Sequence, residues 1–154
     1  MDSTHGPIGG VAGKNRGHIE QSKYDAQVIG PAVNRSGAVG GLIGLNSGSL
    51  SQSVTNAHTS SSLISAPIGG IAAINVGKIG VDVFWRNDVG AATTGVGQGN
   101  LLPPTSGLYA AELAKSASYG PTWDFSSSGA WVPPELYGFP GFKIRRRRTP
   151  SHSG

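Results

Sequence analysis

The sequence of 154 residues contains no cysteine, which excludes disulfide bonds, thiolate ligands for a metal and a thiol nucleophile. Charged residues are also scarce, since Asp, Glu, Lys and Arg make up only 13% of the chain. No run of about 18 apolar residues is present, so the sequence predicts no membrane span. The start, MDSTHGPIGG, lacks the basic segment and the apolar run of a secretion signal, so we expect no export signal in this chain.

The basic charge of the chain is concentrated at one place. The net charge of +4 equals the contribution of Arg145 to Arg148, because residues 1–144 hold equal numbers of acidic and basic side chains. The body therefore offers no basic face that could follow a phosphate backbone, and we do not expect nucleic acid as a partner. Residues 144–154 are expected to be disordered. Their arginines are open to three interpretations: a solvated end, a contact with an anionic surface or nucleic acid, or translated sequence beyond the domain.

The residues that are abundant are glycine and small polar residues. The chain has 25 glycines and 10 prolines, and the glycines follow no collagen triplet. Tight backbone turns are the better interpretation, and a helix-rich fold is disfavoured. The length fits one modest domain.

A pattern of glycine, aliphatic residues and asparagine occurs three times. The copies are Pro7 to Ile19, Ala38 to Leu50 and Pro67 to Ile79. Matching glycines, Gly10, Gly41 and Gly70, are 31 and then 29 positions apart. A period of about 30 residues is typical of repeats that stack on each other.

The residue types in the pattern suggest how each repeat folds. Aliphatic residues such as Leu42 are expected to point inward from short strands; the matching strand positions hold Ile8, Val39 and Ile68. Asn15, Asn46 and Asn75 each precede a glycine by two residues, where an Asn side chain can bond its own backbone in a sharp turn. Each unit is thus predicted to be a strand, a turn and a strand. Stacked units predict an all-β chain, a short β-solenoid (β-helix); a β-sandwich or a low-complexity disordered chain is the alternative.

The second copy, GGLIGLNSGSLSQS, resembles the GLUG repeat of large bacterial surface proteins of the filamentous haemagglutinin type, which are exported by two-partner secretion. It carries Gly41-Leu42-Ile43-Gly44 intact, whereas the other copies, Gly10-Val11-Ala12-Gly13 and Gly70-Ile71-Ala72-Ala73, are degenerate. The resemblance implies an adhesin at the cell surface or outside the cell.

The order of motifs after the repeats also resembles that family, over residues 6–143 in all. The motifs are Phe84-Trp85, the Gly-rich GAATTGVGQGN, GLYAAEL at 107–113, Trp123-Asp124-Phe125, Trp131-Val132 and YGFPGFK at 137–143. Arg86, Tyr109 and Phe142 depart from the residues usual in the family, and Tyr109 replaces the expected helix cap. The resemblance implies a C-terminal cap after the last repeat.

A cap also has a physical purpose, because an uncovered end of a strand stack exposes unpaired backbone groups and open core. Residues 107–119 are predicted to contain a short helix with Leu108 and Ala111 on one side. The large rings after position 120 are predicted to seal the apolar interior, and a carbohydrate-binding platform is the rival interpretation. These rings are Trp123, Phe125, Trp131, Tyr137, Phe139 and Phe142.

Sequence motifs of catalysis and cofactor binding are incomplete. GGVAGKN lacks the first glycine and the Ser or Thr of a phosphate loop, and GVGQGN at 95–100 is expected to be a flexible loop. His5, His18, His58 and His152 have no metal-ligand spacing. We therefore predict no catalytic, cofactor-binding or metal-binding residue and assign no ligand-binding residue.

The sequence predicts three regions and one main function. Residues 1–100 are predicted to form the repeats (about 6–36, 37–65 and 66–100), residues 101–143 a small mixed cap with a short helix, and residues 144–154 the tail. The expected function is a non-enzymatic adhesive or structural module, which displays loops such as 56–65 to a protein or glycan of a host or neighbouring cell and belongs to a longer polypeptide. The alternatives are an accessory or spacer module of a secreted peptidase or glycan-processing enzyme, and a nucleic-acid-associated protein that binds through its basic tail.

Overall fold

The computed structural model describes residues 6–29, 38–61 and 66–143. Within these ranges the chain is mostly β-strand, and α1 (Ala110–Leu113) is the one α-helix. Nearly all strand pairs of this part of the chain are parallel. The prediction of an all-β chain with a short helix is confirmed. The predicted disordered tail, with Arg145 to Arg148, lies outside the described residues.

Each of the first two repeats forms five short strands, more than the strand, turn and strand that the pattern predicted. The first repeat contains β1 (Ile8–Gly9), β2 (Ala12–Asn15), β3 (His18–Glu20), β4 (Lys23–Tyr24) and β5 (Gln27–Ile29). The second contains β6 (Val39–Gly40), β7 (Ile43–Asn46), β8 (Ser49–Ser51), β9 (Ser53–Thr55) and β10 (His58–Ser60). The corners before β4 and β9 are made by Gln21 and Gln52, whose φ angles of 51° and 42° turn the chain sharply from one sheet to the next.

The third repeat keeps four of these strands, and the chain then adds two more. The third repeat contains β11 (Ile68–Gly69), β12 (Ala72–Asn75), β13 (Lys78–Ile79) and β14 (Val83–Arg86). After it, β15 (Val96–Gly99) pairs with β12 and β16 (Gly107–Leu108) pairs with β14. The segment 95–100 was therefore wrongly predicted to be a loop: its glycines let it lie against β12, where a Cβ on Gly97 would crowd the backbone of Ala73 and Ile68.

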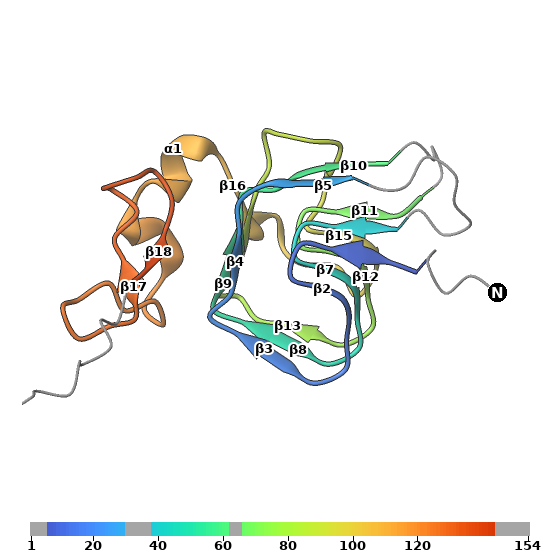
Figure 1. Ribbon diagram of the computed structural model, residues 1–154, viewed down its shortest axis with the longest axis horizontal. Helices are drawn as coiled ribbons and strands as arrows, with labels where there is room; N and C mark the ends of the chain where they lie inside the picture. The colour runs from blue at the N-terminus through green and yellow to red at the C-terminus, as the bar shows by residue number, and fades with distance from the viewer. Residues whose placement is uncertain (1–5, 30–37, 62–65, 144–154) are drawn as a thin grey trace, which may run out of the picture.

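Matching strands of successive repeats lie beside each other, in parallel and in register. The sheets are β1-β6-β11, β15-β12-β7-β2, β13-β8-β3, β16-β14-β9-β4 and β10-β5. In Figure 1 the strands of the three repeats lie one behind another around a common interior. The paired glycines permit this approach, since a Cβ on Gly41 would overlap the carbonyl oxygen of Gly70 in the next repeat. The asparagine turns are also stacked, with Asn15 opposite Asn46 and Asn46 opposite Asn75.

The apolar interior between the sheets is filled by side chains from all three repeats. Leu42, Ile71 and Val83 are fully buried there, together with Trp85. Val11 occupies the position that matches Leu42 and Ile71, yet its side chain is 42% exposed because the first repeat has a neighbour on one side only within the described chain. The expected inward direction of the aliphatic residues therefore holds best in the second and third repeats.

Residues 56–65 were predicted to form a loop between repeats. The structure instead places His58–Ser60 in β10, which pairs in parallel with Gln27–Ile29 of the first repeat. Thr59 points inward and is buried, while its neighbours in the strand are exposed. The alternation of a β-strand explains this pattern. Residues 62–65 lie outside the described part of the chain.

The C-terminal region after β16 is compact and has little regular structure. It contains α1, the 3-10 turn η3 (Ser116–Tyr119) and the antiparallel pair β17 (Trp131–Val132) and β18 (Gly141–Phe142). Leu108 and Ala111 do not share a helix face as predicted, because Leu108 lies in β16 and Ala111 is exposed. The helix begins after Tyr109, whose N–H donates to Glu112 Oε1 at 2.9 Å, and it buries Leu113.

The aromatic residues of this region were predicted to seal the apolar interior of the stack. They instead cover the outer face of one of its sheets. Trp123 and Trp131 pack with Val54 and Phe84, which project from β9 and β14. The neighbours of Phe84, Val83 and Trp85, belong to the interior cluster on the other face of the same sheet. Figure 1 shows the region, in orange, beside β4, β9 and β16. The C-terminal region packs here because Val54 and Phe84 make the outer face of this sheet apolar, and burying that face is favourable.

Among the described residues, no helix is long and apolar enough to cross a membrane.

Candidate functional site

A ladder of buried asparagine side chains connects the three repeats. Asn15 Nδ2 donates to Asn46 Oδ1 at 2.9 Å, and Asn46 Nδ2 donates to Asn75 Oδ1 at the same distance. Asn75 Nδ2 donates to the carbonyl oxygen of Asn100 at 3.1 Å. The Oδ1 atoms of Asn15 and Asn75 also accept the N–H of Gly17 and Gly77, the bond expected for such a turn. The bonds between repeats add to this turn and satisfy buried polar groups.

A second polar ladder runs along the outside of the repeats. Asn56 Nδ2 donates to Asp25 Oδ1 at 2.9 Å, and Arg86 Nη1 donates to Asn56 Oδ1 at 3.1 Å. Arg86 Nε donates to Asp88 Oδ1 at 2.6 Å. These contacts give a physical reason for arginine at position 86: as a pure donor it complements the acceptor oxygen of Asn56.

Two corners of the repeats hold the C-terminal region by hydrogen bonds. Gln52 Oε1 accepts the indole N–H of Trp131 at 3.1 Å, and Gln52 Nε2 donates to the Thr122 carbonyl oxygen at 2.6 Å. Trp123 Nε1 donates to the carbonyl oxygen of Asp82 at 3.0 Å, and the hydroxyl of Thr122 donates to Asp82 Oδ2 at 3.1 Å. Both tryptophans therefore pair their polar atoms as well as burying their rings, as buried Trp usually does.

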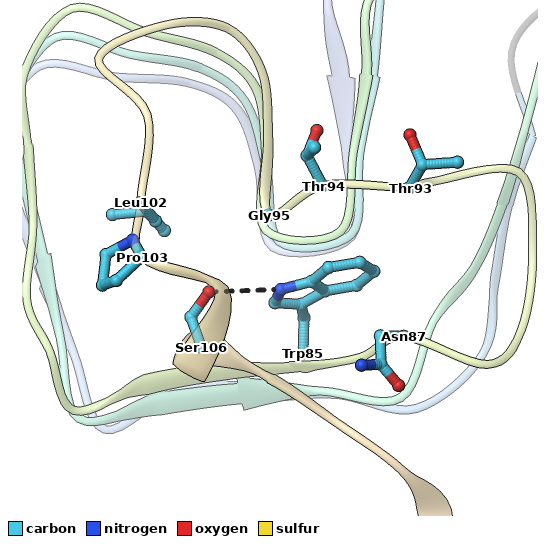
Figure 2. A pocket seen from close by; sticks show the side chains of 8 residues that line it. All are labelled: Trp85, Asn87, Thr93, Thr94, Gly95, Leu102, Pro103 and Ser106. Carbon is cyan, nitrogen blue, oxygen red and sulfur yellow. Dashed lines mark hydrogen bonds between the residues drawn. The ribbon is translucent and has the colours of Figure 1, made fainter.

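A cavity of about 280 Å³ lies at the C-terminal end of the stack. Its lining comes from the end of β14, the segment before β15 and the segment before β16; the residues are Trp85, Asn87, Thr93, Thr94, Gly95, Leu102, Pro103 and Ser106. Figure 2 shows the indole of Trp85 at the centre, with Leu102, Pro103 and Ser106 on one side and Thr93, Thr94 and Gly95 above. No lining residue carries a charge.

The polar atoms of the cavity are only partly satisfied within the described chain. Trp85 Nε1 donates to Ser106 Oγ at 3.3 Å, a long bond, and the buried Ser106 hydroxyl has no acceptor there for its own proton. Asn87 Oδ1 is buried without a hydrogen-bond partner. Thr94 Oγ1 donates to the carbonyl oxygen of Val96 at 2.7 Å. The cavity thus combines an aromatic ring with hydroxyl and amide groups, the composition of many small-molecule sites.

None of the titratable groups with a perturbed pKa in the described chain lines the cavity. The hydrogen bond from Arg86 lowers the pKa of Asp88 below its ordinary value. The hydrogen bonds from Ser116 lower the pKa of Glu135, and those from Ser126 lower the pKa of Asp124. Burial raises the pKa of Tyr119, whose hydroxyl donates to the carbonyl oxygen of Leu113 at 2.6 Å. Each shift has a structural partner that explains it.

Of the four histidines considered for metal binding, the structure describes His18 and His58, which lie in different strands. His18 and His58 are both exposed, in β3 and β10, and His18 contacts Ser49 and Glu20. His5 and His152 lie outside the described residues. No group of three or more His, Asp or Glu side chains suited to a metal occurs in the part of the chain that the structure describes.

The sequence did not reveal the cavity. Its residues come from three segments that share no motif, and Trp85 was noted only in the Phe84-Trp85 motif, within the predicted third repeat (about 66–100). The one available signal was the strand period of two, which places Trp85 on the inner face with Val83.

Comparisons of the chain with protein-family models, with curated proteins and with solved structures found no match.

Proposed function

We propose that this chain is a non-enzymatic structural and adhesive module of a bacterial surface or secreted protein, folded as a short β-solenoid of the GLUG-repeat type. The observation that carries the proposal is the asparagine ladder, which repeats the same side-chain bond at 2.9 Å between the first and second and between the second and third repeats. In-register strands and buried amide ladders favour a rigid stack, because each layer fixes the position of the next.

The first repeat supports a further part of the proposal, that more layers precede it in a longer polypeptide. Strands β1 to β5 each pair on one side only within the described chain, which leaves the opposite backbone edge open. Ile8, Ile19 and Tyr24 are half-buried, whereas Val39 and Leu50 at matching positions are buried. Asn15 Oδ1 accepts one backbone bond, from Gly17, and among the described residues no second donor uses its other lone pair. A parallel layer with its own asparagine is the occupant that fits this edge.

The open edge is tested by hydrogen exchange on the chain alone and on a chain extended at its N-terminus by one copy of residues 38–66. The expected result is slow exchange of the β7 and β8 amides in both proteins and slower exchange of the β2 and β3 amides in the extended one. Unchanged exchange of β2 and β3, with the added copy unfolded, would contradict the idea that the edge accepts a layer.

The adhesive role is tested with beads that carry the purified chain. We expect the beads to adhere to bacterial or epithelial cells and soluble chain to compete with them, since exposed side chains on a rigid stack are fixed in position for contact. The same chain denatured by heat before coupling, at the same density on the beads, is the matched control. Adhesion equal to that of the control on every surface would argue against an adhesive role, and turnover of a peptide or glycan substrate by the pure chain would argue for an enzyme.

A further inference from the structure

We propose that the Trp85 cavity binds one uncharged, polyhydroxylated ring of the size of a hexose, that is, a single neutral sugar unit. The inference goes beyond the proposed function and does not depend on it, because the cavity is formed by the last layer whether or not the surface of the stack adheres to cells.

The size of the cavity restricts its ligand. A volume of about 280 Å³ is at the small end of ligand sites, which generally span roughly 300–1,000 Å³. One sugar ring fits such a volume, whereas a nucleotide or an extended peptide does not. The cavity is open to solvent at its rim, where Thr93, Thr94 and Pro103 are exposed.

The chemistry of the lining selects a neutral ligand with several hydroxyls. No charged side chain lines the cavity, and the nearby Arg86 is engaged by Asp88 and Asn56. An ion would therefore find no opposite charge, and its desolvation would be uncompensated. A purely apolar ligand would cover the Ser106 hydroxyl and leave its proton without an acceptor.

Ser106 and Trp85 supply the specific contacts. The Ser106 oxygen already accepts the indole N–H, so the hydroxyl proton is free for a ligand oxygen. A sugar hydroxyl can accept a hydrogen bond from Ser106 and donate a hydrogen bond to a second acceptor. The apolar surface of Leu102 and the indole edge contacts the C–H face of the ring.

Gly95 keeps this space open. A Cβ at position 95 would lie 3.1 Å from Trp85 Nε1, 3.2 Å from Ser106 Oγ and 3.4 Å from Leu102 Cδ1, among the atoms proposed to meet the sugar. All three are side-chain atoms, and Gly95 does not have a positive φ, so an alanine can be accommodated in the backbone. Gly95→Ala therefore fills the site with one methyl group.

The test is a titration followed by NMR, with methyl glycosides of glucose, galactose, mannose and N-acetylglucosamine as probes. The three tryptophans give three indole N–H signals, and two of them, those of Trp123 and Trp131, come from residues that do not line the cavity. We expect at least one probe to shift the Trp85 signal saturably, with a Kd on the order of 1 mM, as few ligand atoms permit. The other two signals should stay fixed.

Variants decide whether the shift comes from this cavity. Gly95→Ala should abolish the Trp85 response while the Trp123 and Trp131 signals report an intact fold. If that variant does not fold, Thr93→Ile narrows the rim at an exposed position and should weaken binding about tenfold. Thr105→Ile is the matched control, because Thr105 is also exposed but does not line the cavity, and its binding should be unchanged.

A second titration, with disaccharides that end in the same sugar unit, distinguishes whether the cavity binds the end of a glycan or a free monosaccharide. Equal or tighter binding of the disaccharide assigns the site to the end of a glycan, and loss of binding assigns it to the free monosaccharide. The proposal is overturned if no probe shifts the Trp85 signal saturably up to about 100 mM, or if all three indole signals shift together, or if Gly95→Ala folds and binds as the unchanged chain does.

Discussion

The first and second repeats carry the same sequence pattern, but the structure gives them different surroundings. The second repeat has a layer on both sides, and Val39, Leu42, Ile43 and Asn46 are fully buried. The first repeat has a layer on one side within the described chain, and Val11 is 42% exposed. The comparison teaches that the contribution of a repeat residue to stability depends on how many layers contact it, and less on its place in the pattern.

The largest expected difference is between two asparagines of the ladder, Asn46 in its middle and Asn15 at its end. Asn46→Ala removes bonds to Asn15, to Asn75 and to the carbonyl oxygen of Lys78, leaving buried polar atoms unpaired. We expect it to lower the free energy of unfolding by about 4 kcal/mol. Asn15→Ala breaks bonds at the end of the ladder, where water replaces part of them, and should cost about 1 kcal/mol. Urea denaturation of both variants measures the difference, and equal costs would contradict a ladder held from both sides.

The next effect compares one chemical change in two layers. Val39→Ala removes methyl groups that are 0% exposed, and we expect a loss of about 2 kcal/mol in the free energy of unfolding. Val11→Ala removes the same groups at a largely solvated position and should cost less than about 0.5 kcal/mol. Thermal and urea unfolding provide the measurement. A large loss for Val11→Ala would mean that the first layer is covered in solution.

A smaller effect concerns the two glutamine corners. Gln21 and Gln52 share the same backbone conformation, but only Gln52 bonds to the C-terminal region, through Trp131 and Thr122. Gln52→Ala should lower the free energy of unfolding by about 1 kcal/mol and speed the exchange of the Trp131 indole proton. Gln21→Ala changes the same kind of backbone position without losing these bonds. The difference between the two variants therefore measures the contribution of the Gln52 side chain. Equal loss in both variants would assign the effect to the backbone.

The smallest expected effect is a change in the pH dependence of stability, and it comes from the ion pair of Arg86 and Asp88 on the outside of the repeats. The pKa of Asp88 is lowered from 3.8 by its bond to Arg86, so its contribution to stability is complete above about pH 4 and is lost as the pH falls through the folded value. Asp88→Asn should therefore flatten part of the decline in melting temperature as the pH falls below about 4. A melting curve with an unchanged acid slope would mean that the ion pair does not persist in solution.

The sequence was sufficient to predict the stack but not what surrounds it. The alignment of Asn15, Asn46 and Asn75 followed from the period and from turn chemistry, because residues that repeat at a fixed distance occupy equivalent places in stacked layers. The position of the aromatic region could not be derived in the same way. It depends on Val54 and Phe84, whose outward direction is fixed by a corner at Gln52 and by one additional residue between Ile79 and Val83.

The cavity was missed for a related reason. Trp85, Thr94 and Ser106 belong to three different segments and meet because β15 and β16 continue the pairing of β12 and β14. The sequence 95–100 contains three glycines and a single large apolar residue, so a strand could not be distinguished from a loop until its pairing with β12 was known.

The side attachment of the C-terminal region has a mechanical consequence. Gln52 belongs to the second repeat and Asp82 to the third, while Lys23 of the first repeat places its Nζ 5.7 Å from the ring centre of Phe139. The region therefore acts as a splint across all three layers. We expect a force that pulls the layers apart to break these hydrogen bonds before the second layer separates from the third. The first layer contacts the region through Lys23, which lies over Phe139 and Phe142, so we expect rupture to begin there.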